Sequence, residues 1–209
     1  MNREVLFIAD DFGLTREANA AIVRAHRDGA LHGASLMLGQ PATADAVALA
    51  KQTPTLQVGW HLHLCHSQPV TRAAWPWGDS YTKAGWAIGL SGKARALMRG
   101  EIAAQWEQCK ATGLRCAFVN SHHHLHMHPL VFRAMLDVLP ADFDGWVRRG
   151  WPCRFRRSNS LWGVHRTFRM NAGEVRAAMA KLPAGLHEFL FHPRNVEHDC
   201  DFQALMELK

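Results

Sequence analysis

The sequence lacks long apolar runs. Its longest are as short as the run at residues 5–9, Val-Leu-Phe-Ile-Ala, whereas a transmembrane helix needs roughly 20 apolar residues. No apolar core of about 7–15 residues follows the N-terminus, so no signal peptide is expected. The five cysteines are an odd number and form no C-x-x-C pair. We therefore expect reduced thiols in a cytoplasmic protein.

Acidic residues are the minority among the charged residues, with 18 Asp and Glu against 24 Lys and Arg and a net charge of +6. The positive charge concentrates at residues 148–157, which hints at a nucleic-acid or anionic partner. The sequence contains no helix-turn-helix, RRM motif or zinc-finger spacing. A solvated basic face is therefore the favoured interpretation, and no nucleic-acid partner is predicted.

Several catalytic motifs are also missing, namely G-x-S-x-G, the P-loop and G-x-G-x-x-G. Histidine is abundant instead, with 14 residues among 209. The composition, 48% hydrophobic and 20% charged, is that of a globular protein. From the length we expect one domain, residues 1–209. If the histidines converge, they indicate metal or proton chemistry.

Short apolar segments alternate with segments of helical character, which predicts an α/β fold with a largely parallel sheet, open or closed into a barrel. Residues 66–90 are rich in Pro, Gly and Trp and are predicted as a long irregular loop. Expected strands cover residues 4–9, 34–38, 56–64, 114–121, 145–149 and 186–192, with an uncertain one at 161–170. Expected helices cover residues 16–27, 42–51, 93–112, 129–139, 172–182 and 201–208.

Polar residues follow the carboxyl ends of the predicted strands, where sites form in parallel α/β folds. Asp10 and Asp11 end the first strand. One interpretation is a turn with a helix N-terminal charge. The other is a site in which one carboxylate binds a metal and the other acts as a base. In a regular strand, the two side chains would point to opposite faces.

Two further strands carry histidines in alternation with apolar residues. His61 and His63 share one face of the third strand. In the run of residues 121–128, His122, His124, His126 and His128 share a face if the backbone stays extended. A surface histidine loop is the alternative, but metal binding or proton transfer is favoured.

The last strand places Glu188 and His192 on the same face, with the phenylalanines facing outward. Buried structural pairing is the alternative for these two residues. Together, the candidates provide a carboxylate and two imidazoles for a divalent cation, a second carboxylate and further histidines. This is the inventory of metal-assisted hydrolysis, in which a metal acidifies water and polarises a carbonyl while a base and an acid move protons.

At these residues the sequence resembles the YdjC-like carbohydrate deacetylases, which include chitooligosaccharide and hopanoid-biosynthesis-associated deacetylases. The matching motifs occur in the family's order along nearly the whole chain. They are A-D-D-F-G-L at residues 9–14, G-W-H-L-H-L at 59–64, V-N-S-H-H-H-L-H at 119–126, and Glu188 with His192-Pro193.

The resemblance implies a distorted TIM-like (β/α) barrel that removes an acetyl group from an N-acetylated sugar or glycolipid. Asp11, His61 and His122 match the metal ligands. Asp10 matches the base, and His192 is the candidate acid. Arg148 corresponds to an arginine that orients a carboxylate. We expect the remaining pocket and substrate contacts to come from His63, His124, His126 and Glu188.

Two positions depart from the usual family pattern. Asn120 stands where many members have Asp, and the hopanoid-type members share this Asn, which favours that branch. Arg194 replaces the Gly of the family's H-P-G motif, so the geometry around His192 differs. The chain is also shorter than typical members, which predicts a more open site.

The metal and the substrate contacts have alternatives. The resemblance implies Mg²⁺, but a carboxylate with two imidazoles suits Zn²⁺, Mn²⁺ or iron better. Trp75, Trp77 and Trp86 are candidates for sugar stacking or for core packing. A phosphoesterase or a polyol isomerase on a similar barrel would also explain the His and Asp clusters. The oligomeric state stays open, with a homodimer as one alternative.

Overall fold

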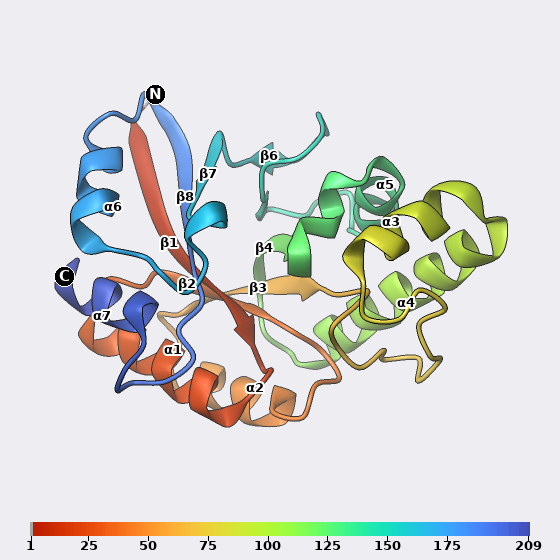
Figure 1. The fold of residues 1–209 in the computed structure, drawn as a ribbon, viewed down its shortest axis with the longest axis horizontal. Helices are drawn as coiled ribbons and strands as arrows, with labels where there is room; N and C mark the ends of the chain where they lie inside the picture. Colours follow the sequence, from red (N-terminus) through yellow and green to blue (C-terminus); the bar gives the residue numbers. More distant parts are fainter. Residues whose placement is uncertain (1) are drawn as a thin grey trace.

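A single eight-stranded sheet curls through the computed structural model, which describes residues 2–209 (Figure 1). Met1, the first residue of the predicted domain, lies outside this range. The strand order is β6-β5-β4-β3-β2-β1-β8-β7, and every neighbouring pair is parallel. The predicted fold class, an α/β distorted TIM-like barrel, is confirmed as a curled half-barrel.

The strands and helices alternate along most of the chain. The strands are β1 (Arg3–Phe12), β2 (Gly33–Leu36), β3 (Gln57–Leu62), β4 (Cys116–Ser121), β5 (Trp146–Val147), β6 (Arg156–Arg157), β7 (Ser160–Trp162) and β8 (Gly185–Phe191). The helices are α1 (Arg16–Asp28), α2 (Thr43–Lys51), α3 (Tyr81–Leu90), α4 (Gly92–Ala111), α5 (Pro129–Asp137), α6 (Ala172–Met179) and α7 (Cys200–Glu207). Two 3₁₀ turns are η1 (His122–Met127) and η2 (Val164–Arg166).

The helices begin at the residues that the sequence marks as caps. The Thr15 hydroxyl accepts a hydrogen bond from the Ala18 amide at 3.1 Å, and α1 ends at Gly29 as predicted. Asn171 caps α6 in the same way. In Figure 1, α1, α2, α6 and α7 lie on one side of the molecule and α3, α4 and α5 on the other. None of the helices in residues 2–209 is long and apolar enough to cross a membrane.

The inner face of the curled sheet has an apolar floor and a polar layer above it. Ile8, Phe118, Trp146 and Leu186 are buried in one small cluster on this floor, together with Leu6 and Ala117. Two residues further along each strand path stand Asp10, Asn120, Arg148 and Glu188. Because side chains on one face of a strand recur every second residue, these polar residues lie on the same inner face as the apolar floor, closer to the carboxyl ends of the strands.

Gly59 is required at this floor because a Cβ there would lie 2.3 Å from the Phe118 ring. His61 follows two residues later on the same face of β3, and it pairs in register with Asn120 of β4. The glycine therefore admits the Phe118 ring beneath the histidine.

One predicted loop is partly wrong. Residues 66–90 contain α3, which begins after Ser80, whose hydroxyl accepts from the Lys83 amide at 3.3 Å. The sequence does not predict this helix because it contains Gly85 and Gly89, and glycine is unfavourable in helix interiors. The uncertain strand at 161–170 shrinks to β7 and is followed by η2, and the two-residue β6 was not predicted.

Candidate active site

Asp11, His61 and His122 come together at the carboxyl ends of β1, β3 and β4. One ligand atom from each lies within 4.8 Å of the other two. Asp11 Oδ1 is 3.3 Å from His61 Nε2 and 2.9 Å from His122 Nδ1. Within residues 2–209, neither Asp11 Oδ1 nor His61 Nε2 has a hydrogen-bond partner, although both are buried. Buried polar atoms that face one another without partners are suited to a shared cation.

A β-bulge brings both aspartates to the same site. The register of β1 against β2 shifts between Ala9 and Phe12, and Asp11 has a φ of 65°. This left-handed conformation is unusual for a residue other than glycine and recurs at functional sites. The bulge turns Asp11 into the cavity that Asp10 also lines, whereas a regular strand would have separated the two carboxylates.

Asn120 connects His61 to Asp10. The Asn120 amide nitrogen donates to Asp10 Oδ1 at 3.1 Å, so its carbonyl oxygen faces His61 Nδ1 at 2.6 Å. His61 Nδ1 must then carry the proton of the neutral imidazole, which leaves the Nε2 lone pair facing Asp11. Hydrogen bonds of this kind fix the tautomer and ring orientation of metal-binding histidines.

The charges around His61 favour a cation. Burial acts to lower the pKa of His61, but Asp10 and Asp11 outweigh it and raise the pKa. Burial likewise acts to raise the pKa of Asp11, but His122 and His61 hold it well below its usual range. The site therefore stabilises a negative carboxylate beside positive charge.

Arg148 lies fully buried between Asp10 and Glu188. Its Nη1 and Nη2 donate to the two Asp10 oxygens at 2.6 and 2.8 Å, and its Nε donates to Glu188 Oε1 at 2.7 Å. Burial acts to raise the pKa of Asp10, but Arg148 and His61 outweigh it and hold the pKa far below its usual range. Asp10 is therefore ionised at neutral pH.

Glu188 differs from Asp10 although both contact Arg148. Its Oε2 has no hydrogen-bond partner in the described part of the chain, and burial raises its pKa. Asp10 also accepts from the Ser35 hydroxyl at 2.6 Å. Arg148 and His61 both lower the pKa of Asp10, whereas the charge of Asp10 adds to burial in raising the pKa of Glu188.

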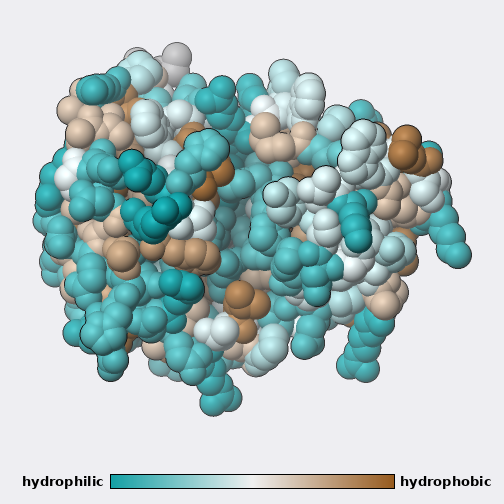
Figure 2. Space-filling model, viewed as in Figure 1, coloured by the Kyte–Doolittle hydropathy of each residue, from teal (hydrophilic) through white to brown (hydrophobic). Residues whose placement is uncertain are grey.

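A cavity of about 420 Å³ opens above this layer, which is within the usual size range of small-molecule sites. The hollow between the two halves in Figure 2 has mainly hydrophilic walls. His192, Phe168 and Val164 line the cavity from one side, and Tyr81 and His123 from the other. The His192 amide donates to Asp201 at 2.7 Å, its ring contacts Phe168, and its Nδ1 has no partner within residues 2–209. Arg194 places its guanidinium 4.1 Å from the centre of the Phe168 ring.

His63 and His126 do not line this cavity, which corrects the expectation that they would. His63 lies beyond the end of β3, with its ring 2.9 Å from the Leu38 carbonyl and 2.9 Å from the Ser67 hydroxyl. The His126 ring contacts the Ser121 hydroxyl at 2.7 Å and the Arg149 carbonyl at 3.2 Å. Burial lowers the pKa of His63 to about 4 and that of His126 to about 3, so both are neutral packing groups at pH 7.

The histidine run does not stay extended, because His123 and His124 have φ values of 50° and 54° within η1. The turn separates the even-numbered histidines, so that His122 and His124 line the cavity and His126 does not. Burial lowers the pKa of His124 to about 3. Glu188 also misses the cavity and faces Arg148 instead.

The tryptophans divide between packing and exposure. Trp77 is buried and donates to the Leu64 carbonyl at 2.6 Å, and Trp75 stacks on it. Neither lines the 420 Å³ cavity. Trp86 is exposed on α3 and lines an adjacent depression of about 550 Å³ that shares Tyr81, His123 and His124 with the cavity.

The basic cluster at residues 148–157 does not form one continuous face. Arg148 is buried in the site. Arg156 pairs with Glu4 at 2.5 Å, and Arg157 donates to the carbonyls of Gly150 and Trp151. Glu4 therefore offsets the charge of Arg156, while the two carbonyls orient the Arg157 guanidinium.

A model of the family described as YdjC-like protein matches residues 4–207. The chain belongs to the YdjC-like family. Curated relatives named carbohydrate deacetylase include one from Vibrio vulnificus strain YJ016, 38% identical over 137 residues, and one from Brevibacillus brevis, 36% identical over 145 residues. The matches cover 65% and 68% of this chain but only 54% and 58% of the relatives, so this YdjC-like chain spans little more than half of their length.

Two solved structures share the fold of this YdjC-like protein. A candidate cellobiose-phosphate cleavage protein from Enterococcus faecalis superposes with a TM-score of 0.75 at 16% identity, covering 100% of this chain and 93% of that one. A family 4 carbohydrate esterase from Streptomyces lividans, in complex with acetate, gives a TM-score of 0.51 at 11% identity, covering 99% and 85%.

Proposed function

We propose that this protein is a metal-dependent hydrolase that removes an acetyl group from an N-acetylated sugar or glycolipid. The observation that carries the proposal is the convergence of ligand atoms from Asp11, His61 and His122, of which Asp11 Oδ1 and His61 Nε2 are buried without a partner among the described residues, beside an ionised Asp10 in one cavity. Relatives named carbohydrate deacetylase support the acetylated sugar as substrate.

Asp11, His61 and His122 would hold one divalent cation. Two imidazoles and one carboxylate suit Zn²⁺, Mn²⁺ or iron, whereas family resemblance favours Mg²⁺. When bound, such an ion supplies a Lewis acid that polarises a carbonyl and acidifies water.

Asp10 is the proposed general base. Its Oδ1 accepts from Ser35, Asn120 and Arg148, whereas Oδ2 accepts only from Arg148 among the described residues. Oδ2 therefore keeps a lone pair for the proton of the attacking water. The water oxygen bonds to the acetyl carbon, the C–N bond breaks, and the free amine needs a proton. His192, across the cavity, is the proposed donor of that proton.

The central experiment measures acetate release from N-acetylglucosamine oligomers and from an N-acetylated glycolipid, the substrate type that Asn120 and the hopanoid-type branch favour. The protein is first stripped of metal with a chelator, and Mg²⁺, Mn²⁺ or Zn²⁺ is then added back. We expect acetate release that requires a metal and disappears in Asp11→Asn. The exposed Asp142→Asn is the matched control and should keep activity.

Other outcomes would redirect the assignment. Phosphate release from sugar phosphates without acetate release would favour the phosphoesterase alternative. Acetate release that survives chelation would remove the metal from the proposal. The five cysteines are free thiols, as expected in the cytoplasm, where we propose that the protein works.

Replacing Asn120 with Ala should weaken metal binding about 10–100-fold, the usual effect of removing a hydrogen-bond partner from a metal-binding histidine. The substitution removes the hydrogen-bond partner of His61 Nδ1, so the orientation of the His61 ring is no longer fixed. Competition with a chromogenic chelator measures the affinity. Ser35→Ala is the matched control, because Ser35 also contacts Asp10 but does not touch His61. Equal metal affinities in the two variants would contradict the role of Asn120.

A further inference from the structure

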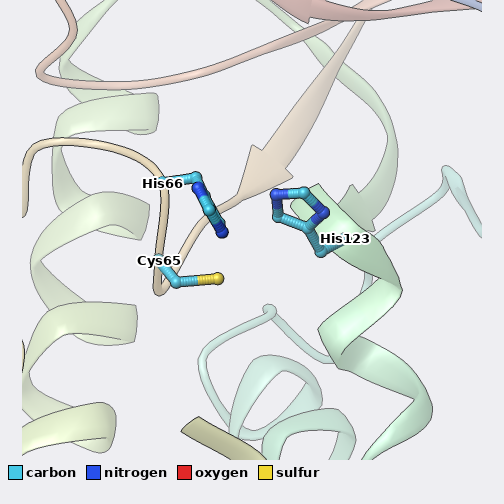
Figure 3. A group of neighbouring side chains, drawn as sticks. All are labelled: Cys65, His66 and His123. Carbon is cyan, nitrogen blue, oxygen red and sulfur yellow. The ribbon is translucent and has the colours of Figure 1, made fainter. Parts of the chain in front are cut away.

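A second group of ligand side chains lies beside the Asp11 set and shares no residue with it. Cys65 and His66 follow β3, and His123 lies in η1. One ligand atom from each lies within 4.8 Å of the others. Figure 3 shows the Cys65 sulfur and the two imidazole rings around a common space. The centres of the two rings are 4.7 Å apart.

Local contacts fix the backbone around these residues. Cys65 is buried, and its carbonyl accepts from the Ser67 hydroxyl at 3.0 Å. The His66 amide donates to Asp79 at 3.1 Å. His66 and His123 both have positive φ values, 49° and 50°. Such conformations cost free energy in residues other than glycine and occur where the surroundings impose them.

We propose that Cys65, His66 and His123 form a second metal site, which takes Zn²⁺ or another soft or borderline cation. One sulfur and two imidazole nitrogens are ligands that favour zinc or copper over magnesium. Cys65 is buried, whereas His66 and His123 are exposed. Three protein ligands with an open side leave a fourth tetrahedral position for water or another small ligand.

The proposed site adjoins the cavity. The centre of the His123 ring lies 4.1 Å from the centre of the His122 ring and 5.5 Å from the centre of the Tyr81 ring, on which it stacks. All three residues line the cavity. A cation on His123 would fix this wall and add positive charge beside the Asp11 set. The proposal does not depend on the deacetylase reaction, because it concerns binding alone.

Cobalt(II) is the probe, because zinc is spectroscopically silent. The reduced, metal-free protein is titrated with Co²⁺, and a thiolate ligand produces a charge-transfer absorption band that a site of oxygen and nitrogen ligands lacks. We expect the band in the wild type and in Asp11→Asn. It should vanish in Cys65→Ser and be bleached when Zn²⁺ displaces cobalt. Cys200→Ser, which alters an exposed thiol, is the matched control and should keep the band.

Cys65 is buried, so Cys65→Ser could lose the band through misfolding. His66→Ala is a second test, because His66 is exposed and its replacement should not disturb folding. Loss of this ligand should weaken zinc binding at this site, measured as the Zn²⁺ concentration that bleaches the thiolate–cobalt band, by more than about tenfold, since removing even an outer partner of a ligand costs 10–100-fold. The exposed His198→Ala should leave the affinity unchanged. A wild type without the band, a band that persists in Cys65→Ser, or unchanged zinc affinity in His66→Ala would each overturn the proposal.

Discussion

Replacing Asp10 with Asn should lower kcat for acetate release about 10²–10⁴-fold while KM changes little. The amide is similar in size and still accepts from Arg148, but it cannot take a proton from water. Asp10 is not among the three converging metal-ligand candidates, so most metal affinity should remain. Steady-state kinetics at saturating metal, with circular dichroism to confirm folding, tests this expectation.

His61→Ala provides the contrast, because it should lose metal binding and recover part of its activity in excess metal. If Asp10→Asn keeps activity within a few-fold of wild type, Asp10 is not the base. His124 would then be the next candidate, since it lines the same cavity and burial keeps it neutral, with a pKa of about 3.

The longer strands, β1, β3, β4 and β8, are predictable from the sequence because burial imposes periodicity, whereas the two-residue β6 is not. The outward-facing phenylalanines of β8 illustrate this, since Phe189 and Phe191 both contact Phe7 beneath the helices. The convergence of Asp11, His61 and His122 also follows from the fold, because parallel strands present their carboxyl ends at one rim.

The local backbone of the site was not accessible in the same way. The bulge at Asp11 and the positive φ values of His123 and His124 occur in residues whose types do not require them. Tertiary packing imposes these conformations, so periodicity extrapolated through them places His126 in the cavity when it binds Ser121 and Arg149 instead. The sequence likewise shows the basic cluster around Arg148. It does not show that Arg148 is buried, because that depends on Asp10 and Glu188, which other strands supply.

Replacing Arg148 with Met should destabilise the protein by about 3–5 kcal/mol at pH 7, the usual cost of removing one partner from a buried ion pair. Arg148 is fully buried, and both Asp10 and Glu188 would lose their cation. Urea unfolding measures the difference. The exposed neighbour Arg149→Met is the matched control and should change stability by only about 0.5 kcal/mol.

The pH dependence follows from the lowered pKa of Asp10. A carboxyl whose pKa is lowered by folding adds stability above its unfolded pKa of about 3.9, and that stability is lost as the pH falls towards the folded pKa. In Arg148→Met this contribution disappears, and the buried carboxylates become easier to protonate. The stability gap between wild type and variant should therefore be largest near neutral pH and shrink as the pH approaches about 4.

Adding Asp10→Asn and Glu188→Gln to Arg148→Met removes the unpaired charges and should restore most of the loss. A gap that stays constant with pH would mean that Arg148 stabilises the barrel by packing rather than by charge.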